Sequence, residues 1–219
     1  MNPMDDRHRV RVLIADDHRL VADACRNLLE PEFNVVAMVS DGRELLKVEP
    51  ELRPDVIILD ISMPGLNGLD AGELIKQRNH TVKLIYITMS VAADVAAEAF
   101  RRGASGYVVK QSSAEELITA IRRVVRGQSY LSPLITKDTV EYLLRSGAVY
   151  NEEKRITTRQ SEVLQLLAEG KSMKEVAYIL QLKPGTVAFH KYRIMEALGI
   201  KTSAALIEYA IKHHMISSQ

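Results

Sequence analysis

The chain has 219 residues, which is room for two small domains. Hydrophobic residues make up 47% of the chain and charged residues 26%, as in ordinary globular proteins, and the absence of Trp with only three Phe predicts an aliphatic core. The single cysteine, Cys25, excludes an internal disulfide and a cysteine-based zinc site and fits a reducing compartment.

No apolar run has the length needed to cross a bilayer, and the polar start MNPMDDRHR has no apolar core of a signal peptide. These features predict a cytoplasmic protein with no membrane partner. The net charge of +1 is unevenly distributed, because ten Lys/Arg stand against six Asp/Glu from Glu153 onward, and 19 against 22 before it. The basic C-terminal part is therefore suited to contact a polyanion.

Five apolar runs alternate with helical patterns in the first part of the chain. This order is typical of an α/β domain, in which a parallel sheet carries helices on both faces. Ser113 and Glu116 have the spacing of a capping box at the start of the last of these helices, which we expect to run to Arg126. The predicted strands are residues 10–16, 34–39, 55–60, 83–88 and 106–110.

Acidic residues stand at the carboxyl ends of two of these strands, Asp16 and Asp17 after the first and Asp60 at the end of the third. Open parallel sheets bind their ligands at this edge. Carboxylates about 5 Å apart repel by roughly 3 kcal/mol per pair at an effective dielectric near 20, so the cluster is costly as mere structure. A divalent cation removes that cost, and Mg²⁺ is the hard ion that carboxylates and water hold beside phosphate.

Two further strands end in groups that can hydrogen-bond phosphoryl oxygens, the hydroxyl of Thr88 and the ammonium of Lys110. An aromatic residue, Tyr107, stands three positions before the lysine. From the residues alone, a doubly wound domain with incidental polar residues at its strand ends stays open as the alternative.

This ordered set resembles the receiver domain of bacterial response regulators, and the resemblance extends from about Val10 to Arg126. It implies a flavodoxin-like α/β fold with five parallel strands in the order 2-1-3-4-5, which makes the first and third strands neighbours. It also implies that Asp60 is the phospho-acceptor, and that Asp17, Asp60 and the main-chain carbonyl of Ser62 bind Mg²⁺ with support from Asp16. By the same resemblance, Thr88 and Lys110 sense the phosphoryl group, and the ring of Tyr107 moves with Thr88.

The region from Ile156 to Met215 is predicted to form four short helices, because helix start and stop signals are frequent in it. A helix over residues 172–181, a three-residue turn and a helix over residues 184–198 have helix-turn-helix spacing. The signals are the capping pairs Thr157 with Gln160 and Ser172 with Glu175, the stop residues Gly170 and Gly199, and Pro184 at a first helical position.

In the helix over 184–198, the apolar spacing turns Val187, Ile194 and Leu198 inward, together with the stem of Lys191. The residues then facing out include two aromatics on a basic helix, and such a surface needs a partner. Major-groove readout of DNA fits. A three-helix core with a partly solvated third helix is the alternative from periodicity alone. The outward residues are Ala188, Phe189, Tyr192, Arg193 and Glu196.

The segments TTRQSEVLQLLAEGKSMKEVAYIL and TVAFHKYRIMEALGI closely resemble the DNA-binding domain of LuxR/NarL-type regulators, over essentially Ile156 to Ile216. The chain departs from the family pattern at Lys183, where Ser normally caps the recognition helix, and at Ala188 and Ser203, where Lys and Arg are common. These departures predict that the recognition helix lacks a side-chain cap and that its phosphate contacts or its base preference differ from those of the family. The DNA contacts that the resemblance implies are Lys183, Thr186, Ala188, Phe189, His190, Lys191, Tyr192 and Arg193.

The expected organisation is a receiver domain over 8–127, a linker with a short helix within 134–144 over 128–152, and a helix-turn-helix domain over 153–219. The resemblance implies a DNA-binding response regulator, not an enzyme, in which a sensor histidine kinase phosphorylates Asp60 and the active homodimer binds an inverted repeat in double-stranded DNA. Surplus apolar residues of the last helix, Leu206 to Ile211, are the candidate dimer face. RNA polymerase is a further candidate partner.

Two alternatives remain at this stage. A Mg²⁺-dependent phosphohydrolase of the haloacid dehalogenase type would use Asp60 as nucleophile, but such enzymes carry a second Asp two residues later, where this chain has Ser62. A receiver regulated by protein partners without phosphorylation usually lacks an acidic or lysine position, and none is missing here.

Overall fold

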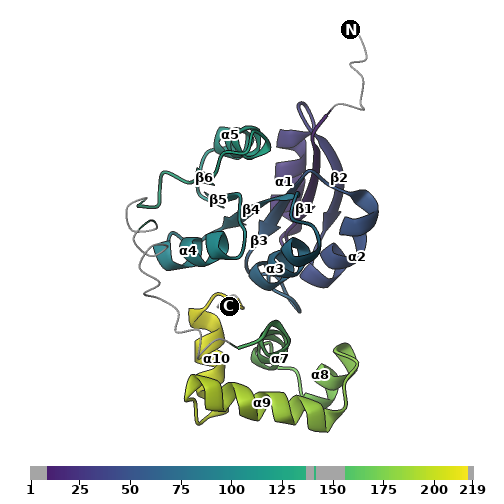
Figure 1. The fold of residues 1–219 in the computed structure, drawn as a ribbon, viewed down its shortest axis with the longest axis vertical. Coiled ribbons are helices and arrows are strands. Elements are labelled where there is room, and N and C mark those ends of the chain that lie inside the picture. The colour runs from purple at the N-terminus through teal and green to yellow at the C-terminus, as the bar shows by residue number, and fades with distance from the viewer. Residues whose placement is uncertain (1–8, 137–140, 142–155, 217–219) are drawn as a thin grey trace.

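The protein is described by a computed structural model that covers residues 9–136, 141 and 156–216. An α/β domain forms its N-terminal part and a helical domain its C-terminal part, and the two lie against each other (Figure 1). Within the described residues, every helix is too short or too polar to span a membrane. The linker helix predicted within 134–144 lies mostly outside the described residues, as does the domain boundary near residue 152.

The sheet has six parallel strands in the order β2-β1-β3-β4-β5-β6, so the predicted order of the first five is confirmed. Each strand is a short apolar run, as expected for a parallel sheet buried on both faces. The strands are β1 (Arg11–Ala15), β2 (Asn34–Val39), β3 (Val56–Asp60), β4 (Lys83–Thr88), β5 (Gly106–Val109) and β6 (Tyr130–Leu131).

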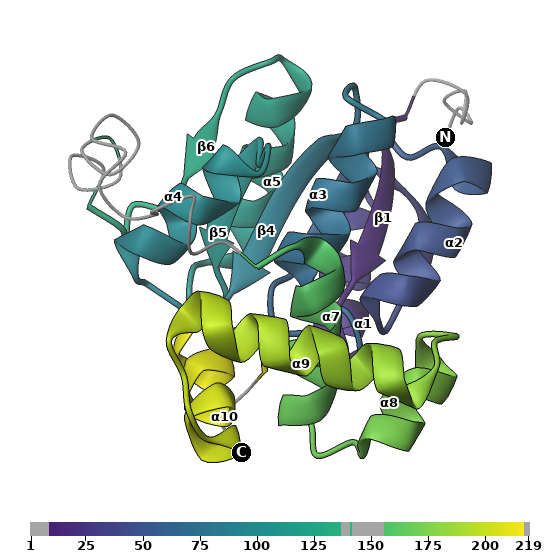
Figure 2. The same cartoon turned by 60° about the horizontal axis from the view of Figure 1, so that its bottom comes forward.

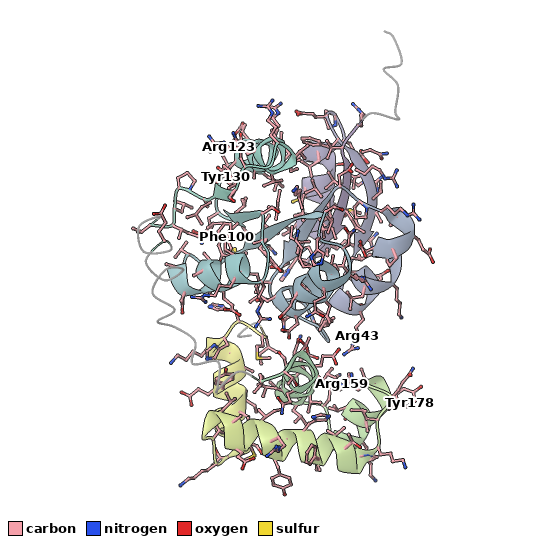
Figure 3. The ribbon with its side chains drawn as sticks, viewed as in Figure 1. Arg43, Phe100, Arg123, Tyr130, Arg159 and Tyr178 are labelled. Atoms are coloured by element: carbon pink, nitrogen blue, oxygen red, sulfur yellow. The ribbon has the colours of Figure 1, made fainter. Side chains whose placement is uncertain are left out.

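The sixth strand corrects the expected organisation, which placed Tyr130 and Leu131 in the linker over 128–152. They pair with Gly106 and Tyr107 of β5, and the backbone N–H of Tyr130 donates to the carbonyl of Ser105 at 3.0 Å. The ring of Tyr130 is buried, and the guanidinium of Arg123 lies 5.6 Å from its centre (Figure 3). Burial of this aromatic ring stabilises a strand that is too short to be recognised from its pattern.

Among the described residues, five helices cover the two faces of the sheet. Alternate residues of β1 and β3 point to opposite sides, because successive strand side chains do so. Leu13, Ile57 and Leu59 pack with α2 (Gly42–Leu52), α3 (Gly68–Arg78) and α4 (Ala93–Arg101), whereas Val12, Ile14 and Ile58 pack with α1 (Arg19–Leu29) and α5 (Ala114–Val125).

The capping box predicted at the start of α5 does not form. Ser113 is the N-cap residue but its side chain makes no capping hydrogen bond. The carboxylate of Glu116 instead accepts a hydrogen bond from the hydroxyl of Ser132 at 2.6 Å. Ser132 follows β6 directly, so the strand that the sequence analysis missed also supplies the competing partner.

The C-terminal domain has the four predicted helices, α7 (Thr158–Ala168), α8 (Met173–Ile179), α9 (Pro184–Leu198) and α10 (Ser203–Lys212). Both capping boxes predicted here are present, at Thr157 and Ser172. Val187 and Ile194 are fully buried and Leu198 partly so, which confirms the predicted inward stripe of α9. The domain has its own apolar core, formed by residues from all four helices.

Candidate functional site

The carboxyl edge of the sheet brings the predicted acidic residues together. Strand β1 lies between β2 and β3, with Ala15 opposite Leu59, so Asp16 and Asp60 follow at the same edge. Asp16, Asp17 and Asp60 each offer one carboxylate oxygen, and these atoms lie within 4.8 Å of one another. Hard oxygen ligands that converge in this way suit Mg²⁺, so the donor set fits the ion that the sequence predicted.

Lys110 joins this cluster from the end of β5. Its ammonium lies 2.9 Å from Asp60 and 2.8 Å from Asp16. Burial alone would lower the pKa of Lys110, but attraction to the two carboxylates raises it overall, so the side chain stays charged. Burial raises the pKa of Asp60, and Lys110 opposes this effect. The lysine therefore offsets part of the repulsion among the carboxylates.

His18 is a member of the cluster that the sequence analysis missed. Its Nδ1 lies 3.0 Å from a carboxylate oxygen of Asp17, and its backbone N–H donates to Asp16 at 2.8 Å. The signal in the sequence was its position directly after Asp16 and Asp17, which places it at the same edge of the sheet as the two acidic residues.

Thr88 and Tyr107 are connected through one residue, Ser90. The hydroxyl oxygen of Thr88 accepts from the backbone N–H of Ser90 at 3.1 Å, and the hydroxyl of Tyr107 donates to the carbonyl of Ser90 at 3.1 Å. Tyr107 is fully buried, so its ring already points inward. A rotation of the Thr88 side chain that moves its hydroxyl oxygen away from Ser90 would break the Ser90 contact and thereby affect the residue that Tyr107 bonds.

The second candidate surface is the outer face of α9. Phe189 is 59% exposed and Tyr192 71% exposed, which confirms that both aromatics point outward. Figures 1 and 2 show α9 on the side of the helical domain away from the sheet, with α7 between them. The α/β domain therefore leaves this face of α9 uncovered.

The polar residues expected on α9 lie around these rings. The guanidinium of Arg193 is 5.9 Å from the ring centre of Phe189 and also pairs with Glu196 at 2.8 Å. Lys191 donates to the hydroxyl of Ser203 at 3.0 Å. Lys183 is the N-cap residue and makes no side-chain capping bond, as its identity predicted. Of the other predicted contacts, Ala188, Thr186 and His190 are half-buried, and the Nδ1 of His190 has no hydrogen-bond partner among the described residues.

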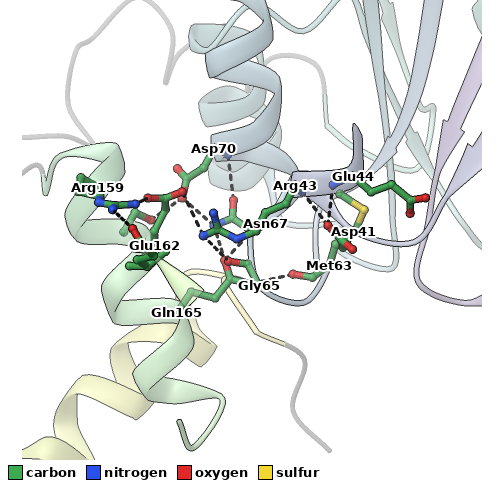
Figure 4. Close-up of polar contacts among 12 residues, drawn as sticks. Asp41, Arg43, Glu44, Met63, Gly65, Asn67, Asp70, Arg159, Glu162 and Gln165 are labelled. Atoms are coloured by element: carbon green, nitrogen blue, oxygen red, sulfur yellow. Dashed lines mark hydrogen bonds and ion pairs between the residues drawn. The ribbon is translucent and has the colours of Figure 1, made fainter. Parts of the chain in front are cut away.

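The interface between the two domains is a buried polar network that the sequence analysis did not predict (Figure 4). Gln165 of α7 is fully buried; its amide N–H donates to the carbonyl of Met63 at 2.7 Å, and its amide oxygen accepts from the backbone N–H of Asn67 at 2.8 Å. The signal was a row of polar residues at four-residue spacing along α7 and its C-cap, Ser161, Gln165 and Glu169.

Charged residues extend this network on both sides. Asp70 of α3 is buried and binds the guanidinium of Arg102 at 2.6 Å and the hydroxyl of Ser161. At the other side, the carboxylate of Glu162 lies 3.2 Å from the guanidinium of Arg43 and 2.6 Å from that of Arg159. Arg43 and Arg159 lie at the boundary between the domains (Figure 3). Each buried charge in this part of the network therefore has an opposite charge beside it.

Two family models match the chain. The response regulator receiver domain matches residues 12–122, and the bacterial regulatory proteins of the luxR family match residues 154–210. The oxygen regulatory protein NreC of Staphylococcus carnosus is 34% identical over 215 residues, which cover 94% of this chain and 99% of that protein. The family is one of transcriptional regulators, which decides against the phosphohydrolase alternative.

Solved structures of similar proteins match both domains of this chain. RcsB of Salmonella enterica serovar Typhimurium, bound to promoter P1flhDC with the phosphomimetic BeF3−, is 29% identical with a TM-score of 0.62 over 92% of this chain and 98% of that one. A structure of two RcsB dimers on two parallel DNAs is 29% identical with a TM-score of 0.55, over 92% and 98%. The chain therefore belongs to the response regulators that join a receiver domain to a luxR-family DNA-binding domain.

Proposed function

We propose that this regulator is controlled by phosphorylation of Asp60 by a sensor histidine kinase. The observation that carries the proposal is the convergence of Asp16, Asp17, Asp60 and Lys110 at one edge of the sheet. A carboxylate oxygen of Asp60 attacks the phosphorus atom, the bond from phosphorus to the donor breaks, and an acyl phosphate forms. Lys110 then binds a phosphoryl oxygen in place of a carboxylate.

Asp17, Asp60 and the main-chain carbonyl of Ser62 are the proposed Mg²⁺ ligands, with Asp16 beside them. A bound Mg²⁺ neutralises charge between the attacking carboxylate and the phosphoryl group. Asp16 accepts from the backbone N–H of His18 and pairs with Lys110, which orients its carboxylate toward the cluster.

The proposed output is binding of α9 in the major groove of double-stranded DNA. The exposed rings of Phe189 and Tyr192 are suited to base edges and thymine methyl groups, and Lys183, Lys191 and Arg193 to phosphates. A single module of this size buries too little surface for tight specific binding, so we propose a homodimer on an inverted repeat. RNA polymerase is a further proposed partner.

The proposed dimer face is the outer side of α10. Leu206 and Ala210 are buried in the core of the domain, whereas Ile207 and Ile211 are each 40% exposed. These two isoleucines lie four residues apart on one side of the helix and give two copies an apolar surface to share. Of the candidate dimer face predicted over residues 206–211, Ile207 and Ile211 are therefore the proposed contact residues.

The test of the proposal is phosphate incorporation from a small phosphodonor in the presence of Mg²⁺. Asp60→Asn should abolish acid-labile labelling, because an acyl phosphate forms only on a carboxylate. Asp55→Asn is the matched control, since Asp55 precedes the same strand at its opposite end, and it should label normally. Wild-type labelling of the Asp60→Asn chain would show that another residue is the acceptor.

A further inference from the structure

Side chains of α7 hold the backbone of the loop that follows Asp60. Gln165 bonds both ends of this loop, at the carbonyl of Met63 and the N–H of Asn67. Between them, Glu169 accepts from the backbone N–H of Gly65 at 2.8 Å and from the side chain of Gln165 at 2.9 Å. Backbone groups of three alternate loop residues, Met63, Gly65 and Asn67, therefore take their partners from the DNA-binding domain. Figure 4 shows the contacts of Gln165 with Met63 and Asn67.

The same loop contains Ser62, whose carbonyl is a proposed metal ligand. The loop is closed by its own hydrogen bond, from the N–H of Gly68 to the carbonyl of Ile61 at 2.8 Å. The carbonyl of Met63, which Gln165 holds, is one peptide unit beyond that of Ser62. The two peptide planes are joined through φ and ψ of Met63, which sterics confine to a few regions, and the loop is closed between Ile61 and Gly68. Holding the Met63 carbonyl therefore restricts the orientation of the Ser62 carbonyl.

We infer that Gln165 is a positioning residue for the cation site, so that docking of α7 and metal binding at Asp16, Asp17 and Asp60 strengthen each other. The inference rests on the proposed metal site. A ligand that is ordered before the ion arrives does not lose its conformational freedom on binding, so the docked loop binds the ion more tightly than a free loop. By thermodynamic linkage, the ion must strengthen docking by the same factor.

This coupling does not depend on the receiver covering the DNA-binding face of α9. Phe189 and Tyr192 are exposed while α7 is docked, so docking and undocking leave the recognition face of α9 equally accessible. What docking changes is the orientation of the DNA-binding domain relative to the receiver. The cation site therefore influences how firmly that orientation is held.

The experiment is a titration of the full chain with Mn²⁺, which takes the same oxygen ligands and whose free ion is measured by electron paramagnetic resonance. Gln165→Ala should weaken Mn²⁺ binding about fivefold or more, the usual lower range of such couplings. Gln165→Glu keeps the size and the acceptor for Asn67 but loses the donor to Met63 and to Glu169, so it should weaken binding similarly. Gln77→Ala, at an exposed position of α3, is the matched control and should bind as the wild type does.

Hydrogen exchange gives the reciprocal measurement. Saturating Mg²⁺ should slow amide exchange in peptides from both residues 61–68 and residues 158–169 of the wild-type chain, and should leave the second peptide unchanged in Gln165→Ala. Equal Mn²⁺ affinities in the wild type and Gln165→Ala would overturn the coupling alone. Absence of Mn²⁺ binding by the wild type would overturn the coupling and the metal site beneath it.

Discussion

At the scale of single residues, Ser90 links Thr88, at the carboxyl edge of the sheet, to the buried ring of Tyr107. Thr88 and Tyr107 both bond this residue, one at its N–H and the other at its carbonyl. If Thr88 turns to a phosphoryl oxygen, Ser90 loses a partner and the backbone that holds Tyr107 is free to move. Such a switch needs contacts that differ between two states, and the bond from Thr88 to the phosphoryl group supplies them.

The first prediction follows from this connection. Thr88→Ala should still incorporate phosphate at Asp60, because the threonine supplies neither the acceptor oxygen nor a metal ligand. The increase in DNA affinity on phosphorylation should be largely lost, which is measured by comparing DNA binding with and without a phosphodonor. Thr81→Ala, at an exposed position before β4, should leave the response intact. A normal response in Thr88→Ala would rule out this route.

A second residue-scale prediction concerns base readout by α9. Replacing Phe189 or Tyr192 by Ala should reduce discrimination between a selected operator and random DNA by about 1–3 kcal/mol, the usual value of a good base contact. Leu20→Ala is the control, since this side chain is 86% exposed on the receiver, and it should leave discrimination unchanged. Discrimination that survives both aromatic replacements would place the base contacts on other residues.

At the scale of elements, capping distinguishes helices that look alike in sequence. Ser172 and Ser113 are both N-cap serines followed three residues later by Glu. The side chain of Ser172 accepts from the N–H of Glu175 at 3.3 Å, and the carboxylate of Glu175 accepts from the N–H of Ser172 at 2.7 Å. At Ser113 no such side-chain bond forms. The N–H of Glu116 donates to the main-chain carbonyl of Ser113 at 3.0 Å, and the carboxylate of Glu116 bonds Ser132.

The two serines therefore predict different costs of substitution. Ser172→Ala should lower the free energy of unfolding of the C-terminal domain by about 1 kcal/mol, because a satisfied cap is lost. Ser113→Ala should change the stability of the receiver by much less. Urea unfolding of the full chain, followed by probes in each domain, measures both. Equal losses of unfolding free energy in the two variants would mean that the hydrogen bonds of the Ser172 capping box add no stability beyond that of a polar N-cap residue.

At the scale of the whole molecule, the two domains meet through α7 and leave α9 facing outward. The C-terminal domain has its own core and both of its capping boxes, so it has the features of a unit that folds by itself. Its net charge from residue 153 onward is positive, whereas the preceding part is negative. DNA affinity should therefore reside in this domain and not in the receiver.

The isolated fragment 153–219 should bind duplex DNA without phosphorylation, and the unphosphorylated full chain should bind with similar strength, because docking leaves the α9 face uncovered. Lys183→Ala should weaken binding to all sequences alike and reduce the dependence of affinity on salt, since one phosphate contact is lost. Gel-shift titrations over a range of salt concentrations measure both effects. If the folded fragment had no affinity for any duplex at low salt, this domain would have to bind protein instead.

The sequence by itself determined the fold class of both domains and predicted most residues of the candidate sites. Short apolar strand runs, polar residues at their ends, and capping pairs are local patterns, and each predicted its element because near neighbours in the chain decide it. The parallel sheet, its order and the inward stripe of α9 are confirmed. The order itself came from resemblance to a family and not from the strand patterns.

Only the tertiary structure decided three features that join distant parts of the chain. β6 is two residues long, and its pairing partner lies more than twenty residues away, so no periodicity reveals it. Glu116 has the right spacing to cap α5, but Ser132 competes for it. Gln165 looks in sequence like one of several polar residues of α7, yet it bridges a loop about a hundred residues earlier. A polar side chain can satisfy its hydrogen bonds with any partner of suitable geometry, and packing of the whole chain selects which partner is near.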